Sequence, residues 1–136
     1  MILMACVDGR NGMAFNCRRQ SRDRAVRADL LAEVGEACLW VSGATARQFP
    51  AEEQSRLCVD ESFLEKAGPG EYCFVEDKDV VLYESRIEEV ILCHWNRDYP
   101  ADMYFKMDLG SWKLAETQEY AGSSHEKITE ERYVRR

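Results

Sequence analysis

Histidine is scarce in this sequence, with two residues in 136, and the patterns that usually bind metal ions are missing. His94 follows Cys93 in a predicted strand, where neighbouring side chains face opposite sides and cannot bind the same ion. His125 stands far from both, beside Glu126. No Cys-x-x-Cys pair occurs, which argues against a zinc knuckle and against a thioredoxin-like redox site. The sequence therefore predicts no metal site.

Long apolar runs are also absent. No stretch approaches the roughly 20 residues that cross a bilayer as a helix. The first residues, MILMACVD, lack the basic start and the cleavage site of a signal peptide, and we interpret them as a first strand. The formal net charge of -7 argues against a surface built as a whole for nucleic acid or for an anionic membrane. We therefore expect a cytoplasmic protein without a membrane partner.

Cysteine, in contrast, is well represented. The six residues are Cys6, Cys17, Cys38, Cys58, Cys73 and Cys93. Most of them lie in predicted strands among apolar neighbours, where a free cysteine behaves as a small hydrophobic residue. Because no signal peptide is recognised, a reducing compartment is expected, in which disulfides are rare. We predict six reduced thiols with structural roles.

A chain of 136 residues, of which 46% are apolar, is expected to form a single domain, residues 1–136, around one core. Buried strands are predicted at Ile2–Val7, Cys38–Val41, Leu57–Val59 and Tyr72–Val75. Helices are predicted from Ser21 or Asp23 to Val34 and at Ala44–Phe49, Asp60–Lys66 and Asp79–Glu84. Residues Met13–Gln20 show no clear period. Short strands that alternate with helices, followed by a block of strands, are typical of an α/β layer with an antiparallel extension.

The stretch between Ile87 and Phe105 gives the strongest strand signal. An almost continuous apolar run ends at Trp95, as in strands buried on both faces, and its β-branched residues favour a strand over a helix. We expect Ile91 and Cys93 to face one side of a central strand and Leu92 the other. Two alternating segments then flank a turn at residues 121–123.

Several segments resemble dihydrofolate reductase, in the same order along the chain. MACVDGRNGMAFN resembles the first strand and following loop of that family, and WVSGATARQF resembles its turn into the cofactor-side helix. IEEVILCHWNRDYPADMYF, SWKLAETQEY and SSHEKITEERYVR resemble its last strands. The match covers most of a chain that is shorter than typical members by a few elements. The resemblance implies a doubly wound mixed sheet with small flanking helices and a C-terminal antiparallel hairpin.

The resemblance also implies a set of site residues, because the family binds a pterin against the first strand and helix, and NADPH across the ends of the central strands. Ala5 matches the alanine that lies along the pterin, and Met13 falls in the loop that closes over the active site. Cys93 matches a residue on the strand behind the pterin, and Asp23 is the acid nearest to the pterin-binding carboxylate. Thr45 matches the threonine beside the cofactor phosphates.

Three departures from the family pattern argue against NADPH-dependent reduction. Cys17–Gln20 replaces a Leu-Pro-Trp segment, and Arg24 holds the strict register of the pterin-binding acid. Ser42-Gly43 replaces a Gly-Arg pair, which removes a cation from the phosphate site. Glu76–Asp79 replaces a Gly-Gly turn with three carboxylates in four residues. Only glycine allows close backbone approach at low cost, and a pyrophosphate requires positive potential. We therefore predict no bound cofactor.

Arginine is concentrated between Arg10 and Arg27, where six arginines accompany one acid. One interpretation is an anion site formed by Arg18, Arg19 and Arg22. The other is a solvated surface that balances the acidic remainder, with arginine stems covering apolar groups. Aromatic residues do not alternate with these arginines, as a stacking platform for bases requires, so nucleic acid is not the expected partner.

These observations lead to one main hypothesis and two alternatives. The main one is a divergent dihydrofolate reductase-like protein that has lost NADPH-dependent reduction and binds a small molecule or acts as an interaction module. The first alternative is an active reductase of a pterin-like or flavin-like substrate. The second is an anion or nucleic-acid binder that uses Arg10–Arg27. Chains that resemble this one are sometimes labelled ribonuclease Z, but that chemistry needs a metal cluster of several histidines and aspartates, and this sequence has two histidines.

Overall fold

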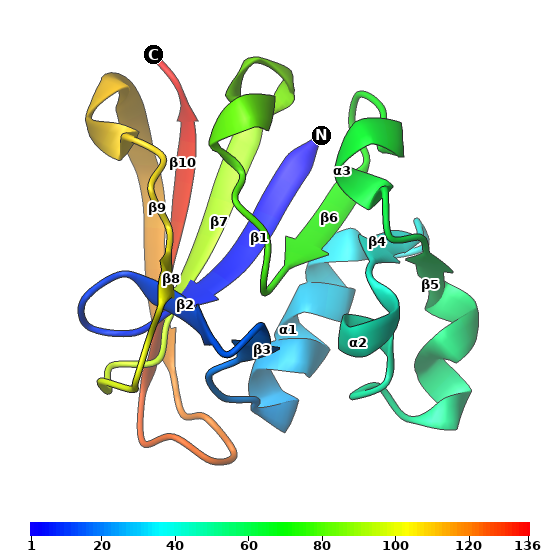
Figure 1. Ribbon diagram of the computed structural model, residues 1–136, viewed down its shortest axis with the longest axis horizontal. Helices are drawn as coiled ribbons and strands as arrows, with labels where there is room; N and C mark the ends of the chain where they lie inside the picture. Colours follow the sequence, from blue (N-terminus) through cyan, green and yellow to red (C-terminus); the bar gives the residue numbers. More distant parts are fainter.

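The computed structural model covers residues 1–136 and is built on a seven-stranded sheet (Figure 1). Its strands are β1 (Ile2–Val7), β4 (Leu39–Val41), β5 (Leu57–Val59), β6 (Tyr72–Val75), β7 (Glu89–His94), β9 (Trp112–Tyr120) and β10 (Ile128–Arg135). They lie in the order β5-β4-β6-β1-β7-β10-β9. Neighbours from β5 to β7 pair in parallel, whereas β10 pairs antiparallel with β7 and β9. The expected mixed α/β sheet with a C-terminal hairpin is confirmed.

The one long helix, α1 (Arg24–Val34), begins and ends where local sequence dictates. The carboxylate of Asp23 accepts a hydrogen bond from the backbone N–H of Ala25, at 2.8 Å, and so caps the first turn. Gly35 ends the helix at a φ of 65°, a conformation that glycine adopts at little cost. The helical spacing buries one face against the sheet, formed by Val26, Leu30, Leu31 and Val34. Both predicted ends of this helix are confirmed.

The remaining helical elements are short, of three to six residues each. They are α2 (Gly43–Ala46), η1 (Ala51–Arg56), α3 (Phe63–Lys66), η2 (Val81–Arg86) and η3 (Leu109–Ser111). Two of the expected helices are therefore shorter than predicted, and the segment expected at Asp79–Glu84 is a 3-10 turn that begins at Val81. None of the helices is long and apolar enough to cross a membrane.

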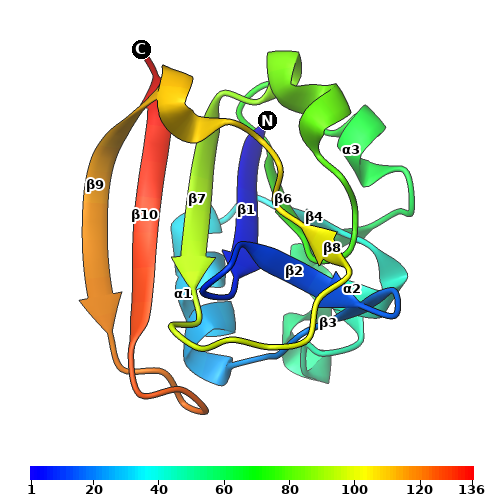
Figure 2. The ribbon, with the colours of Figure 1, turned by 60° about the vertical axis from the view of Figure 1, so that its left-hand side comes forward.

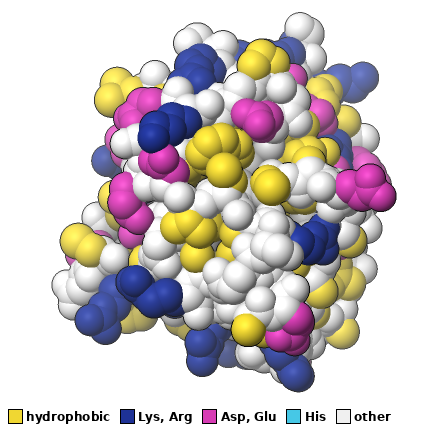
Figure 3. Space-filling model, turned by 90° about the vertical axis from the view of Figure 1, so that its right-hand side faces the viewer, with side chains coloured by type: hydrophobic (Ala, Val, Ile, Leu, Met, Phe, Trp, Pro, Cys, Tyr) yellow, Lys and Arg dark blue, Asp and Glu magenta, His cyan; other side chains and the backbone are white.

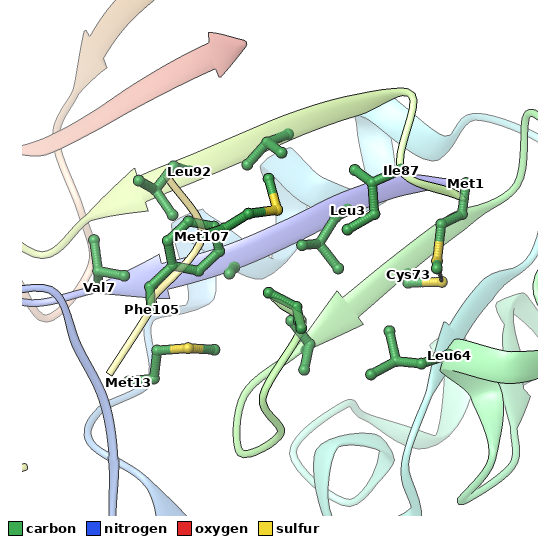
Figure 4. Close-up of a cluster of buried hydrophobic side chains, with 14 of the residues drawn as sticks. Met1, Leu3, Val7, Met13, Leu64, Cys73, Ile87, Leu92, Phe105 and Met107 are labelled. Carbon is green, nitrogen blue, oxygen red and sulfur yellow. Dashed lines mark hydrogen bonds between the residues drawn. The ribbon is translucent and has the colours of Figure 1, made fainter. Parts of the chain in front are cut away.

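Hydrophobic clusters cover both faces of the sheet, so the central strands are buried on two sides. Ile91 and Cys93 belong to the cluster under α1, whereas Leu92 belongs to the cluster on the opposite face. The predicted alternation along β7 is thus confirmed. Figure 4 shows the second cluster, in which Leu92, Phe105 and Met107 approach side chains of β1. This two-sided burial explains why the sequence of β7 shows no polar alternation.

A small second sheet was not predicted. It has the order β3-β2-β8 and consists of β2 (Gly12–Phe15), β3 (Arg18–Arg19) and β8 (Met103–Tyr104). In Figure 2 it lies in front of the large sheet, with α1 behind. β2 and β3 are joined by Asn16 and Cys17, both at positive φ, the backbone of a two-residue hairpin turn. Asn-Cys is not the usual Asn-Gly signal for such a turn, so the hairpin was missed.

The cysteines are less buried than expected. Cys6, Cys73 and Cys93 lie in the interior, but Cys17 and Cys38 are exposed and Cys58 is half-buried. All six are unpaired. Burial raises the pKa of Cys73 to about 12, which keeps this thiol protonated and unreactive. The prediction of structural burial therefore holds for half of the thiols and is wrong for Cys17 and Cys38, which lie in a turn and before a strand.

Candidate functional site

A cavity of about 450 Å³ opens beyond the carboxyl ends of β4 and β6, the edge at which α/β sheets usually bind ligands. Its size lies within the usual range of ligand pockets. The lining is polar, with four arginines and two carboxylates among ten residues: Cys17, Arg18, Arg19, Arg22, Ala44, Thr45, Arg47, Gln48, Glu76 and Asp77. We call it the arginine cavity. The three arginines predicted to bind an anion and the threonine predicted to lie beside a cofactor thus line one space.

Three of the four guanidinium groups in the arginine cavity have no partner within the protein. Arg18, Arg22 and Arg47 form neither an ion pair nor a side-chain hydrogen bond. Arg19 differs, because its Nε lies 3.0 Å from Glu76 Oε1 and its Nη2 donates to the carbonyl oxygen of Ala44 at 2.6 Å. Arg19 is therefore part of the wall, whereas the other three are available to an anionic ligand.

Glu76 forms the floor of the arginine cavity. Its side chain is 9% exposed, and Oε1 accepts hydrogen bonds from Thr45 Oγ1 at 2.8 Å and from Gln48 Nε2 at 2.9 Å, besides that from Arg19. A buried carboxylate is tolerated only with such partners. Because Arg19 neutralises Glu76, the remaining charges of the cavity are three arginines against Asp77. The space therefore has an excess of positive charge.

The N-terminus of α2 borders the arginine cavity, but two of its first three N–H groups are occupied. Gly43 N–H donates to Glu61 Oε2 at 2.7 Å, and Thr45 N–H donates to Ser42 Oγ at 3.2 Å. A helix N-terminus binds phosphate through N–H groups of this kind when they are free. A ligand phosphate would have to displace a carboxylate from Gly43, so the unpaired arginines are the main anion-binding groups of this cavity.

A much smaller cavity adjoins the arginine cavity and shares Arg19 and Glu76 with it. Its other lining residues are Cys6, Met13, Gln20, Ser21 and Trp95. The volume is about 10 Å³, which is room for one water molecule. Met13, predicted to close over a pterin, thus lies at a cavity that is far too small for a fused ring system.

The other predicted substrate-binding residues lie in the interior. Ala5 and Cys93 are fully buried in the clusters on opposite faces of the sheet, and neither lines a cavity described here. Asp23 is buried as well. It lies between the start of α1, which it caps, and the loop before β10, from which it accepts hydrogen bonds. Burial acts to raise its pKa, but hydrogen bonds from Ser123 and His125 outweigh that effect and lower it well below the usual range. Asp23 is therefore an ionised structural carboxylate.

Sequence reasoning gave no role to Arg47 or Gln48, although both line the arginine cavity. Arg47 and Gln48 follow α2, and only the prediction that Thr45 opens a helix beside an anion site could have drawn attention to them. Of the arginine segment, Arg10 lies elsewhere and pairs with Asp98 at 3.6 Å.

The residues hold no group of three or more histidines, cysteines, aspartates and glutamates that could bind a metal ion. The chain matches no protein-family model and no curated protein sequence.

Proposed function

We propose that this protein is a divergent dihydrofolate reductase-like domain that binds a small phosphate-bearing molecule in the arginine cavity and does not use NADPH. The observation that carries the proposal is the set of three unpaired guanidinium groups, those of Arg18, Arg22 and Arg47, around a polar cavity of ligand size. In Figure 3, Lys and Arg side chains gather at the lower left of one face. This concentration of positive side chains contrasts with the net charge of -7 of the whole chain.

The order of the strands supports the family resemblance. A parallel arrangement from β5 to β7 and an antiparallel pair of C-terminal strands are what the resemblance implies, and small helices flank the sheet. The arginine cavity lies beside Thr45, where the resemblance expects cofactor phosphates. This location favours an anionic ligand at the edge that the family uses for binding.

The chemistry of arginine explains why phosphate is the preferred group. A guanidinium offers a planar fork of N–H donors that matches two phosphate oxygens, and its charge does not depend on pH in the physiological range. Three such groups can neutralise a diphosphate or triphosphate. The cavity has only two apolar lining residues, Cys17 and Ala44, so it offers little surface to an aromatic ring.

The same geometry argues against the alternative of an active reductase. The carboxylate of Glu61 accepts a hydrogen bond from the Gly43 N–H of α2, and Glu76 places a second carboxylate where the resemblance expects glycine. The cavity beside Met13 and Trp95 has room for about one water, whereas a pterin or a nicotinamide ring needs a pocket of a few hundred Å³. Reduction would require both rings to meet there.

Calorimetry at low salt tests the proposal with inorganic pyrophosphate, ATP and NADPH as probes. We expect pyrophosphate and ATP to bind with dissociation constants below about 1 mM, and more weakly as salt is added. Substituting Arg18, Arg22 or Arg47 by Ala should weaken binding about tenfold each, the usual loss for one charge-assisted hydrogen-bonding group. Arg97→Ala, an exposed arginine outside the cavity, is the matched control and should leave the affinity unchanged.

Three outcomes would overturn the proposal. The first is no heat of binding with either phosphate probe, and the second is equal weakening by Arg97→Ala and by the cavity variants. The third is micromolar or tighter binding of NADPH, which would support the reductase. Salt-dependent binding of single-stranded RNA that does not compete with pyrophosphate would instead support a nucleic-acid surface.

A further inference from the structure

A serine, a histidine and an aspartate that are distant in the sequence form a continuous hydrogen-bonded array at the start of α1. His125 Nδ1 lies 2.9 Å from Asp23 Oδ2, and His125 Nε2 lies 3.2 Å from Ser21 Oγ. His125 comes from the loop that connects β9 to β10, whereas Ser21 and Asp23 precede α1. The arginine cavity does not include this array, so it is a separate cluster of reactive side chains.

Asp23 fixes the state of the imidazole. The carboxylate can only accept, so His125 Nδ1 carries the proton, and the lone pair of Nε2 in the neutral ring faces the hydroxyl groups of Ser21 and Tyr99. Asp23 itself is held by the N–H groups of Ala25, Ser123 and Ser124. This is the arrangement in which an aspartate orients a histidine and the histidine takes a proton from a serine.

The ring of His125 is also fixed by packing. It is 4% exposed and stacks on Trp95, with ring centroids 4.5 Å apart and an interplanar angle of 20°. The hydroxyl of Tyr99 lies 2.8 Å from Nε2 and competes with Ser21 for the same lone pair. Tyr99 OH is also 3.3 Å from Ser21 Oγ. The base is therefore aligned but shared between two hydroxyl groups.

Ser21 is the accessible end of the array. It is half-buried and lines the one-water cavity together with Arg19. Glu76 lines the same cavity and pairs with Arg19 at 3.0 Å, so the side-chain charges there offset each other. Because the cavity has room for about one water molecule, the body of a substrate would lie outside it, against the exposed side of Ser21.

We propose that Ser21 is a nucleophile activated by His125, with Asp23 as the positioning residue, and that it reacts with small carboxylic esters. Ser21 Oγ forms a bond to the carbonyl carbon while its proton passes to His125 Nε2. The bond from that carbon to the alcohol oxygen breaks, and the alcohol leaves with the proton from Nε2. Water then attacks the acyl-serine, gives one proton to Nε2 and releases the carboxylic acid, and the proton returns to Ser21 Oγ. The reaction is a hydrolysis and needs no other reactant, whatever occupies the arginine cavity.

A fluorophosphonate probe tests the reactivity directly, because it forms a stable bond to an activated serine with loss of fluoride. We expect one adduct per protein, located on Ser21 by peptide mass spectrometry. Ser21→Ala should abolish it, whereas Ser62→Ala, which removes a serine hydroxyl without a hydrogen-bonded histidine, should not. A parent protein without an adduct on Ser21 overturns the proposal, and the array is then only an anchor for the loop.

Two further variants separate activation from anchoring. His125→Asn keeps a donor near Nδ1 for Asp23 but removes the acceptor of the Ser21 proton, so labelling should fall about 100-fold or more. Tyr99→Phe removes the competing hydroxyl and should make labelling faster. Circular dichroism establishes that each variant is folded. Labelling of folded His125→Asn at the parental rate, or slower labelling of folded Tyr99→Phe, overturns the role of Nε2 as base.

Discussion

Glu130 on β10 is expected to make the stability of this protein fall as pH rises, and Glu130→Gln should remove that dependence. The side chain is 5% exposed and accepts hydrogen bonds from Cys93 Sγ at 3.6 Å and from Gln118 Nε2 at 3.2 Å. Burial, together with a hydrogen bond shared with Asp29 on α1, raises its pKa from 4.5 to about 8. Near neutral pH the folded protein thus keeps a proton on Glu130.

The sign and the size of the effect follow from this shift. The unfolded chain releases the proton near pH 4.5, whereas the folded state holds it to about pH 8, so stability is full below the lower value and is lost as pH rises through the higher one. At 1.36 kcal/mol per unit the shift corresponds to at most about 5 kcal/mol. Because this figure is an upper limit, we expect an observable loss of about 2–4 kcal/mol, a large part of the roughly 5–15 kcal/mol typical of a domain.

Urea unfolding of parent and variant at a series of pH values measures the effect. The amide that Glu130→Gln introduces would accept from Cys93 and donate to Asp29 without titrating, so the variant should be nearly as stable as the parent at about pH 5 and more stable above about pH 8. Glu119→Gln changes an exposed carboxylate that is paired with Lys127 on the same hairpin, and it should leave the parental slope intact. Parallel curves for the parent and Glu130→Gln would refute the reasoning.

Two further predictions concern the core and the thiols. Leu92→Ala should cost about 2–5 kcal/mol in the free energy of unfolding, because it empties a site that is 3% exposed, and an unchanged melting temperature would contradict this. Trp112→Phe should cost less than Leu92→Ala. The packing that it loses is partly offset because it removes an indole N–H that is buried without a hydrogen-bond partner. Alkylation without reductant should modify all six thiols after unfolding, and Cys17 and Cys38 first in the native protein, as mass spectrometry can follow; a surviving bridge would refute free thiols.

The layer structure could be predicted because burial on both faces of a strand gives a recognisable apolar pattern in the sequence. The run through Leu92 has no polar alternation, which happens only when both faces of a strand are covered. The ends of α1 were equally predictable, because Asp23 caps the first turn and Gly35 adopts the positive φ at which the helix ends. The hairpin of β2 and β3 was not predictable by the same rules, because Asn16 and Cys17 adopt positive φ without a glycine.

The candidate sites were harder to predict because they depend on pairs of residues that are distant in the sequence. Thr45 and Glu76 meet across 31 positions, and Asp23 and His125 across 102. His125 gave no signal by itself, since a lone histidine beside Glu126 fits no motif. The arginine segment was visible as composition, but only the fold shows that its middle part borders the arginine cavity, whereas Arg10 lines a different cavity beside Asp98.

Glu76 bears both on the expected absence of NADPH binding and on the proposed anion site. A carboxylate at this position disfavours a pyrophosphate when it is free, because both groups are anionic. Here it is not free, since it accepts from Thr45, Gln48 and Arg19 and so joins α2 to β3 at the floor of the arginine cavity. The residue that replaces a cofactor-binding glycine in the family resemblance therefore also supports the cavity in which the unpaired arginines stand.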